Sequence, residues 1–318
     1  MLSKIRRTIR ERGLLYGGER VILACSGGPD SMALLDILHR LRAELDLELI
    51  AAGVNHGLRQ EAKYELRLVQ SEAAKRSIEF VELEVEVERR ASLQGAARQA
   101  RYEALLALKR ERRAQKIAVG HHQDDQAETV LHRILRGGGF HGLGGIEPAR
   151  DDGVIRPLID TPRADLQAHL ERFRIPFVLD PTNREHAHER VRIREVLLPM
   201  LEEEDPQIRV HLAQIADEAR AHRERERVAV DFALARIPRG KTIAIQALEL
   251  FPTHIRPALL TAFIERELPL RLNRPHREST AALLRAKGEV LLPGGYQVIR
   301  SGQRILLRAP ERSGIEDA

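Results

Sequence analysis

Short apolar runs alternate with amphipathic helical segments through the first 180 residues, and this alternation constrains the fold more than any other feature of the chain. The candidate buried strands are residues 20–25, 47–54, 80–87, 116–120 and 154–159. Helical periodicity falls between and after these runs, at residues 30–41, 61–76, 92–112, 124–136 and 161–173. Strands that alternate with helices predict an α/β fold, with a Rossmann-like parallel sheet and helices on both faces.

The rest of the chain predicts a smaller α+β unit. Residues 137–145 contain six glycines and predict a loop, and residues 189–201 predict a helix that ends near Pro199. A long charged helix is expected over residues 206–236, followed by helices at 255–266 and 277–287 and short strands within 289–308. We therefore expect an α/β domain over residues 1–212, then a linker helix and a small C-terminal domain over residues 213–318.

Composition narrows the class of protein. Cys25 is the only cysteine among 318 residues, which excludes an internal disulfide or a site of several cysteine ligands and predicts a reducing, cytoplasmic location. No uncharged apolar run approaches the ~20 residues of a membrane span, so no membrane association is expected. Seven of the 52 basic residues are lysine and the others are arginine. Arginine binds phosphate in a bidentate manner, so a nucleic-acid partner is one interpretation and coding bias is the other.

The motif Ser26-Gly27-Gly28-Pro29-Asp30-Ser31 lies directly between a predicted strand and a predicted helix. Two glycines permit a tight turn close to a ligand, and the amide groups of the helix beyond it attract anions. The two serines add hydroxyl donors. Asp30 cannot itself favour a phosphate, so we expect it to hold Mg²⁺ against one. A plain strand-to-helix turn is the alternative.

A second polar cluster, His121-His122-Gln123-Asp124-Asp125-Gln126-Ala127-Glu128-Thr129, follows the predicted strand at residues 116–120. It falls at the carboxyl end of a parallel strand, the edge at which open α/β sheets bind ligands. Asp125 and Glu128 are three residues apart and share a helix face, so together they can bind Mg²⁺ or an ammonium group. A capped helix start and a metal site with histidine ligands are the alternatives.

Both motifs resemble those of a known family. SGGPDS is similar to the pyrophosphate loop of the N-type ATP pyrophosphatases (PP-loop superfamily), whose fold is adenine nucleotide alpha hydrolase-like. HHQDDQAETVLHRILRGGGFHGLGGI is similar to the signature of the tRNA(Ile)-lysidine synthetases. Further matches to that family are Val54-Asn55-His56-Gly57-Leu58-Arg59, Arg98, Arg101 with Tyr102, Arg156-Pro157-Leu158 and Leu292-Pro293-Gly294-Gly295. Val191 departs from the family, which usually has asparagine there.

The resemblance implies a carbon–nitrogen ligase that modifies tRNA. It would join free lysine to C2 of cytidine 34 in the CAU anticodon of tRNA(Ile), and split ATP into AMP and pyrophosphate through an adenylated cytidine. ATP and Mg²⁺ are the implied cofactors, and a homodimer is compatible with the sequence. The alternatives are another PP-loop tRNA-modifying or amidating enzyme, or a non-catalytic nucleotide- and RNA-binding module.

The resemblance also implies a role for each matching residue. The residues that would bind nucleotide are Ser26, Gly27, Gly28, Pro29, Asp30, Ser31 and His56. The residues that would be catalytic are Asp30, Arg101, His121 and Asp125. Mg²⁺ would be held by Asp30 and Asp124, and lysine by Asp125 and Glu128. Contacts with tRNA fall to Arg190, Arg194, Arg271 and Arg274, the last two in a window, residues 254–285, that holds six arginines and three glutamates.

Overall fold

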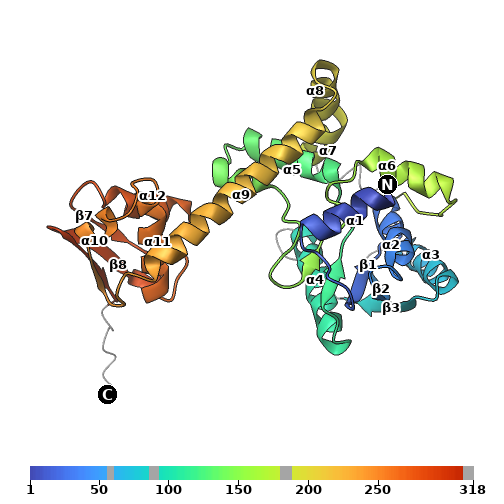
Figure 1. The fold of residues 1–318 in the computed structure, drawn as a ribbon, viewed down its shortest axis with the longest axis horizontal. Coiled ribbons are helices and arrows are strands. Elements are labelled where there is room, and N and C mark those ends of the chain that lie inside the picture. The colour runs from blue at the N-terminus through green and yellow to red at the C-terminus, as the bar shows by residue number, and fades with distance from the viewer. Residues whose placement is uncertain (56–60, 86–92, 180–187, 311–318) are drawn as a thin grey trace. The chain divides into compact units, whose positions relative to one another are not determined.

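The chain divides into two compact units, Met1–Arg220 and Ala221–Ala318 (Figure 1). The structure is a computed structural model that describes residues 1–55, 61–85, 93–179 and 188–310. Helix α9 (Ile208–Leu234) runs through the boundary between the units, and the expected boundary after residue 212 lies in the same helix. None of the helices within the described ranges is both long and apolar enough to cross a membrane.

The first unit is built on a five-stranded sheet with the order β3-β2-β1-β4-β5. Its strands are β1 (Arg20–Ala24), β2 (Glu48–Asn55), β3 (Glu79–Glu84), β4 (Lys116–Ala118) and β5 (Val154–Ile155). All neighbouring strands pair in parallel, which confirms the predicted sheet. In β1, Val21 and Leu23 enter one hydrophobic core and Ile22 enters another, so both faces of the sheet are buried.

Helices cover both faces of this sheet. The helices of the unit, besides the start of α9, are α1 (Leu2–Glu11), α2 (Pro29–Leu41), α3 (Glu61–Lys75), α4 (Leu93–Glu111), α5 (Gln123–Leu135), α6 (Arg163–Arg172), α7 (His188–Arg192) and α8 (Leu198–Glu204). Helices α1, α2, α3 and α6 share the core that receives Val21 and Leu23, whereas α4 packs on the opposite face. Helix α1 was not predicted; it buries Ile5 and Ile9 between its charged residues.

The helix expected over residues 189–201 does not end near Pro199, so that expectation was wrong. Helix α7 continues through a π-helical turn, Ile193–Leu197, into α8, and Pro199 lies in the first turn of α8. In a regular α-helix a proline ring clashes with the carbonyl four residues earlier, and a wider turn before it relieves the clash. The glycine-rich segment is likewise not all loop, because Phe140–Gly144 forms a 3₁₀ turn.

The second unit contains a four-stranded antiparallel sheet with the order β6-β9-β8-β7. Its elements after α9 are β6 (Thr242–Ala244), α10 (Ile245–Glu249), α11 (Arg256–Glu267), α12 (Arg274–Ala282), β7 (Gly288–Leu291), β8 (Gln297–Ser301) and β9 (Arg304–Arg308). Phe263 is fully buried in the core of this unit. The predicted small α+β domain is confirmed, although β6 and α10 were not expected.

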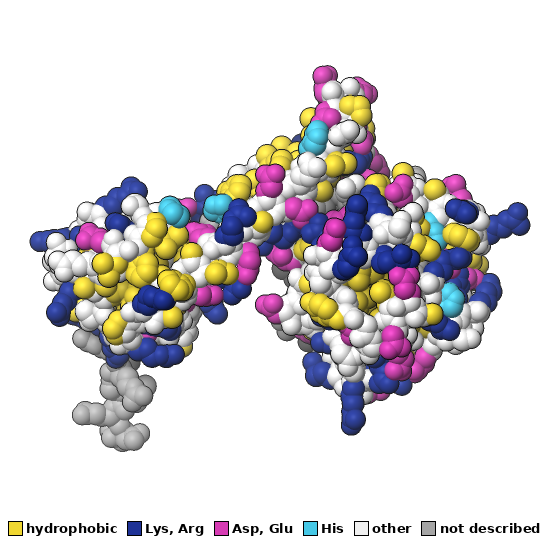
Figure 2. Space-filling view, viewed as in Figure 1, with side chains coloured by type: hydrophobic (Ala, Val, Ile, Leu, Met, Phe, Trp, Pro, Cys, Tyr) yellow, Lys and Arg dark blue, Asp and Glu magenta, His cyan; other side chains and the backbone are white. Residues whose placement is uncertain are grey.

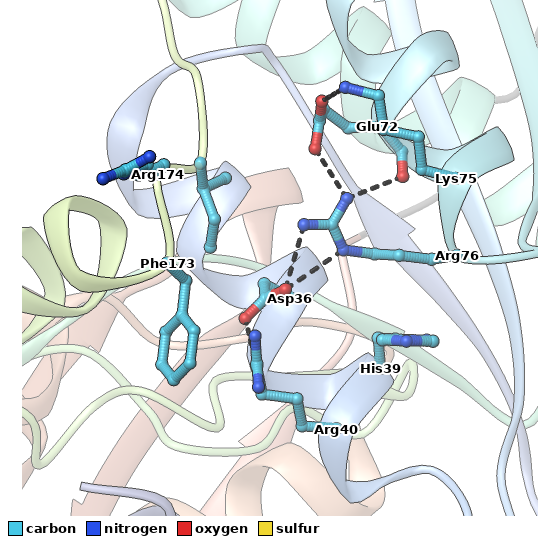
Figure 3. A pocket seen from close by; sticks show the side chains of 9 residues that line it. Asp36, His39, Arg40, Glu72, Lys75, Arg76, Phe173 and Arg174 are labelled. Atoms are coloured by element: carbon cyan, nitrogen blue, oxygen red, sulfur yellow. Dashed lines mark hydrogen bonds and ion pairs between the residues drawn. The ribbon is translucent and has the colours of Figure 1, made fainter.

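A buried carboxylate links three helical segments of the first unit, and Figure 3 shows its contacts with Arg40 and Arg76. Asp36 of α2 accepts hydrogen bonds from Arg76 Nη2 at 2.9 Å, Arg40 Nε at 2.6 Å and His169 Nε2 at 2.8 Å. Arg76 follows α3 and His169 belongs to α6. Burial alone would raise the pKa of Asp36, but the three hydrogen bonds outweigh burial and hold this pKa well below its usual range.

We predict that Asp36→Asn lowers the free energy of unfolding by about 3 kcal/mol at pH 7, because the substitution removes the buried charge that pairs with Arg40 and Arg76. Urea unfolding measures this loss. The ionised carboxylate stabilises the fold above its unfolded pKa of about 4, and this stabilisation disappears as the pH falls. The difference in free energy of unfolding between wild type and variant should therefore stay constant from pH 7 to about pH 5 and narrow as the pH falls below about pH 4.

Glu171→Gln, at an exposed position of α6, is the matched control and should change the free energy of unfolding by less than about 0.5 kcal/mol. An Asp36→Asn cost below about 1 kcal/mol at pH 7, or a cost that does not depend on pH, would contradict the role given to this carboxylate.

Candidate active site

Two loops meet where strands β1 and β4 end, in the middle of the parallel sheet. The chain leaves β1 into α2 and leaves β4 into α5, and the two strands are neighbours. In this strand order the connections diverge between β1 and β4, and open α/β sheets bind ligands at such a point. Gly120 follows β4, and a Cβ atom there would lie 3.0 Å from the carbonyl of Asp30. The absence of a side chain at Gly120 therefore allows the two loops to approach each other.

The loop after β1 turns tightly into α2. Gly27 has a φ of +83°, and a Cβ atom there would lie 3.1 Å from the backbone oxygen of Glu65. This position therefore favours glycine. Gly28 is the N-cap of α2, and Pro29 begins the helix. The first amide groups of a helix have no acceptor within it, so the start of α2 offers N–H donors and the positive end of a dipole to an anion.

The two serines of this loop have different surroundings. Ser31 Oγ donates to the carbonyl of Gly28 at 2.8 Å and accepts from the amide of Ser26 at 3.2 Å, so it shapes the loop. Ser26 is exposed, and its Oγ lies 3.3 Å from Ser31 Oγ. Cys25 just before them is buried, and burial raises the pKa of its thiol to about 12. A thiol of this kind is a poor nucleophile.

His122 joins the two loops. It is the N-cap of α5 and is 2% exposed. Its Nε2 lies 3.5 Å from Asp30 Oδ1 and 3.5 Å from Asp125 Oδ2, and its Nδ1 lies 3.8 Å from Asp124 Oδ2. Burial alone would lower the pKa of His122, but the three carboxylates outweigh it and raise this pKa to about 9. The imidazole is therefore cationic at neutral pH.

His121 has the opposite environment. Its Nδ1 accepts a hydrogen bond from Arg156 Nε at 3.2 Å, which places the ring proton on Nε2. Burial, together with the positive charges of Arg156, Arg98 and Arg101, lowers the pKa of His121 to about 4 despite the nearby Asp125. Burial also lowers the pKa of the Arg101 and Arg156 guanidinium groups. Buried Arg156, half-buried Arg101 and exposed Arg98 thus surround a neutral imidazole, and this arrangement is suited to an anion.

Glu128 and Asp124 each have a cationic partner. Glu128 is buried, and Arg194 donates to both of its oxygens, at 2.5 Å from Nε and 3.0 Å from Nη2. Asp124 Oδ2 accepts from the amide of Arg163 at 2.8 Å, and its Oδ1 lies 3.1 Å from Arg209 Nη1. Two acids in the first half of α5 are thus neutralised by arginines from other segments. Arg194, expected at tRNA, contacts the residue expected to bind lysine.

The other arginines predicted to contact RNA are exposed, and one residue predicted to bind nucleotide cannot be described. Arg190 of α7 is exposed. In the second unit, Arg271 is exposed and pairs with Glu265 at 2.7 Å, and Arg274 is exposed and pairs with Glu278 at 2.8 Å. His56, expected to bind nucleotide, lies outside the described residues.

A metal site is not preformed among the residues that the structure describes, where no three His, Cys, Asp or Glu side chains are grouped to hold an ion. Asp30 is nevertheless a suitable partial ligand, because its side chain is 35% exposed and its ion pair is with a histidine, His122. Mg²⁺ commonly uses one or two carboxylates and completes its shell with phosphate oxygens and water. Both oxygens of Asp124 already have partners, so Asp124 fits less well.

The described residues also form a pocket of about 430 Å³, but it lies beside the Asp36 cluster, further along α2 (Figure 3). Its cations include Arg76 and Lys75, which pair with Glu72 at 2.7 and 2.5 Å. The pocket is therefore lined by a network that stabilises the fold, and it is separate from the two loops at the end of β1 and β4.

Sequence reasoning missed two residues of the site, Arg156 as the partner of His121 and Arg209. His122 was named in the second polar cluster and a capped helix start was considered there, but no role was assigned to this histidine. Arg156 was noted only as part of a family match. Arg209 and Arg194 come from segments distant in sequence, and no local spacing indicates which acid each would meet.

Comparison with known proteins agrees with this geometry. Residues 1–201 match the model of the PP-loop domain family. The U34-tRNA thiolase NcsA from Methanococcus maripaludis has a similar fold, with a TM-score of 0.59 and 17% identity over 68% of this chain and 78% of that chain.

Curated relatives extend the similarity beyond this domain. A tRNA(Ile)-lysidine synthase from Geobacillus kaustophilus is 32% identical over 99% of this chain and 72% of its own length. One from Porphyromonas gingivalis is 31% identical over 96% of this chain and 67% of its own length. One from Clostridium tetani is 37% identical over 64% of this chain, and there the match spans 45% of the relative. The chain therefore belongs to the PP-loop proteins and, within them, to the tRNA(Ile)-lysidine synthase family.

Proposed function

We propose that this protein uses ATP to attach lysine to C2 of cytidine 34 in the CAU anticodon of tRNA(Ile), with release of pyrophosphate and then AMP. The observation that carries the proposal is the meeting of the two loops at β1 and β4, where an anion-binding helix start adjoins an acidic cluster. Membership of the tRNA(Ile)-lysidine synthase family supports the same reaction. A tRNA substrate implies a cytoplasmic enzyme.

The reaction requires an activated cytosine, because its C2 oxygen is a poor leaving group. Attack of this oxygen on the α-phosphate of ATP forms an adenylated base and releases pyrophosphate. The amine of lysine then attacks C2, and AMP leaves. Reactions of this kind depend mainly on the placement of the reactants and on compensation of charge.

The start of α2 suits the pyrophosphate. Amide donors after Gly27 and Gly28, with the hydroxyl of Ser26, would bind the leaving phosphates. Asp30 at the same helix start would hold Mg²⁺, which would neutralise phosphate charge when bound.

The arginine-rich side of the site suits the α-phosphate. His121 is neutral, with its proton on Nε2. It can therefore donate a hydrogen bond from Nε2 to a phosphate oxygen. Arg101 and Arg156 lie near it and would stabilise negative charge as the phosphate is transferred.

The acidic side suits an amine. Asp125 and Glu128 would bind an ammonium group of lysine, because both are carboxylates at the start of α5, and the burial of Glu128 strengthens its attraction for a cation. Arg190, Arg271 and Arg274 are exposed cations that would contact tRNA phosphates. The target base has to leave its stack to enter such a site.

Thiolation of tRNA is the nearest alternative within the same fold, and it fits less well. Sulfur transfer commonly needs a reactive thiol, whereas Cys25 is buried with a raised pKa and is the only cysteine in the 318 residues.

The direct test is to incubate the protein with ATP, radiolabelled lysine and bulk tRNA. We expect label in the RNA, in a product that depends on ATP and on a CAU-anticodon tRNA(Ile). Labelled arginine is the control amino acid and should not be incorporated. The absence of label in any tRNA would instead favour a non-catalytic binding module or another synthetase.

Asp30→Ala should reduce pyrophosphate release at least about 100-fold, because it removes the group expected to hold Mg²⁺ against the phosphates. Release is measured with tRNA and lysine present, across a range of Mg²⁺ concentrations. Asp165→Asn, an exposed acid in the first turn of α6, is the control and should retain the wild-type rate. Near-normal turnover of Asp30→Ala would exclude the assignment.

Glu128→Gln should raise the KM for lysine by about tenfold or more, because one of two carboxylates for the ammonium group is lost. The KM for ATP should change much less. Glu195→Gln, an exposed glutamate beside Arg194, serves as the control. An unchanged lysine requirement would place the amino-acid site elsewhere.

A further inference from the structure

We propose that Arg194 is an internal competitor for the amine site: its guanidinium occupies the carboxylates that bind lysine, and lysine has to displace it. This inference rests on the proposed function, because it concerns the site that Asp125 and Glu128 would form. It also gives Arg194 a role different from the RNA contact expected from sequence.

The contacts of Glu128 leave little room for a second cation. Its side chain is 5% exposed, and Arg194 covers both oxygens through a bidentate pair. Arg194 Nη2 also lies 4.0 Å from Asp125 Oδ1. One guanidinium group thus lies near both carboxylates that would bind the substrate. A second cation in the same position would be repelled in a site sheltered from water.

The other acids of the cluster have different partners. Asp30 and Asp125 face the imidazole of His122, and Asp124 pairs with Arg209. Departure of Arg194 from Glu128 therefore leaves the His122 and Arg209 contacts of these acids in place, and Asp125 loses only the longer 4.0 Å contact with the guanidinium. Glu128 would then be a buried carboxylate without its cation, and an ammonium group can fill that role.

Arg194 is placed so that it can leave. Its side chain is 38% exposed, unlike that of Glu128, so the guanidinium has a path to water. It is carried by the π-helical turn Ile193–Leu197, and turns of this type are often found at functional sites.

Competition of this kind has a consequence for selectivity. An amine whose only contact is its ammonium group gains little by replacing a bidentate guanidinium. An amino acid that makes further contacts in the site can complete the exchange. Arg194 would therefore exclude small amines and inorganic cations from a strongly acidic site, at the cost of weaker binding of lysine.

The test is Arg194→Met, which keeps the length of the side chain and removes its charge. The apparent affinity of a site rises when a competing state is removed, so we expect the KM for lysine to fall by about tenfold. Methylammonium, which we expect not to inhibit the wild type at millimolar concentration, should become an inhibitor competitive with lysine. Arg194→Lys keeps a cation and should retain a KM close to that of the wild type.

The controls separate competition from a structural role. Arg192→Met changes an exposed arginine of α7 and should leave the KM for lysine unchanged. If Arg194 only orients Glu128, Arg194→Met should raise the KM for lysine and methylammonium should have no effect. A raised KM for lysine, or the absence of inhibition by methylammonium in Arg194→Met, would overturn the proposal.

A measurement on the wild type covers the case in which the variant does not fold. The Nε–H signal of Arg194, followed by ¹⁵N nuclear magnetic resonance, should be protected from solvent exchange without lysine and lose protection at saturating lysine. Persistent protection with lysine bound would overturn the proposal. Failure of the proposed function is seen separately, as the absence of labelled tRNA with wild-type protein.

Discussion

The buried imidazole of His122 holds the two halves of the candidate site together. It lies 3.5 Å from an oxygen of Asp30 in one loop and 3.5 Å from an oxygen of Asp125 in the other. Carboxylates this close repel one another unless a cation lies among them. Because the raised pKa of His122 keeps it charged at neutral pH, the imidazolium supplies that cation. The position of Asp30 at the start of α2 thus depends on a residue that caps α5.

Neighbouring histidines divide the site into an acidic and a basic side. His122 has an extended backbone, and successive side chains of an extended chain point in opposite directions. One ring therefore faces carboxylates and the other faces Arg156 and its neighbours, so one is cationic and the other neutral. A reaction that joins an amine to a base activated by a phosphate needs an acidic side for the amine and a basic side for the phosphate, a short distance apart. His121 and His122, two consecutive residues after β4, lie on these two sides.

Local patterns predicted the parts of the fold whose signals are local. Buried runs and helical periodicity predicted the parallel sheet, and SGGPDS predicted an anion site at the start of a helix. Helix α1 was missed because arginine and lysine dominate its sequence, although Ile5 and Ile9 lie on its buried side. The pairing of Glu128 with Arg194 joins residues 66 positions apart, and helical spacing carries no information about such a partner. The acidic cluster was therefore predictable from sequence, but the arginines that pair with its carboxylates were not.

Arginine content is a weaker guide to nucleic-acid binding than its excess over lysine suggests. Arg266 donates to the carbonyls of Leu234 and Ile237 near the end of α9, and Arg300 donates to the carbonyl of Leu283 after α12. These side chains donate hydrogen bonds to carbonyl groups at helix ends, so they stabilise the fold. On the face shown in Figure 2, basic and acidic side chains are interspersed over both units. Arg274 differs, because its partner Glu278 is itself 65% exposed, and such a surface pair contributes little stability. An RNA phosphate can replace a partner of that kind more readily than it can replace Glu265, the partner of Arg271, whose side chain is 9% exposed.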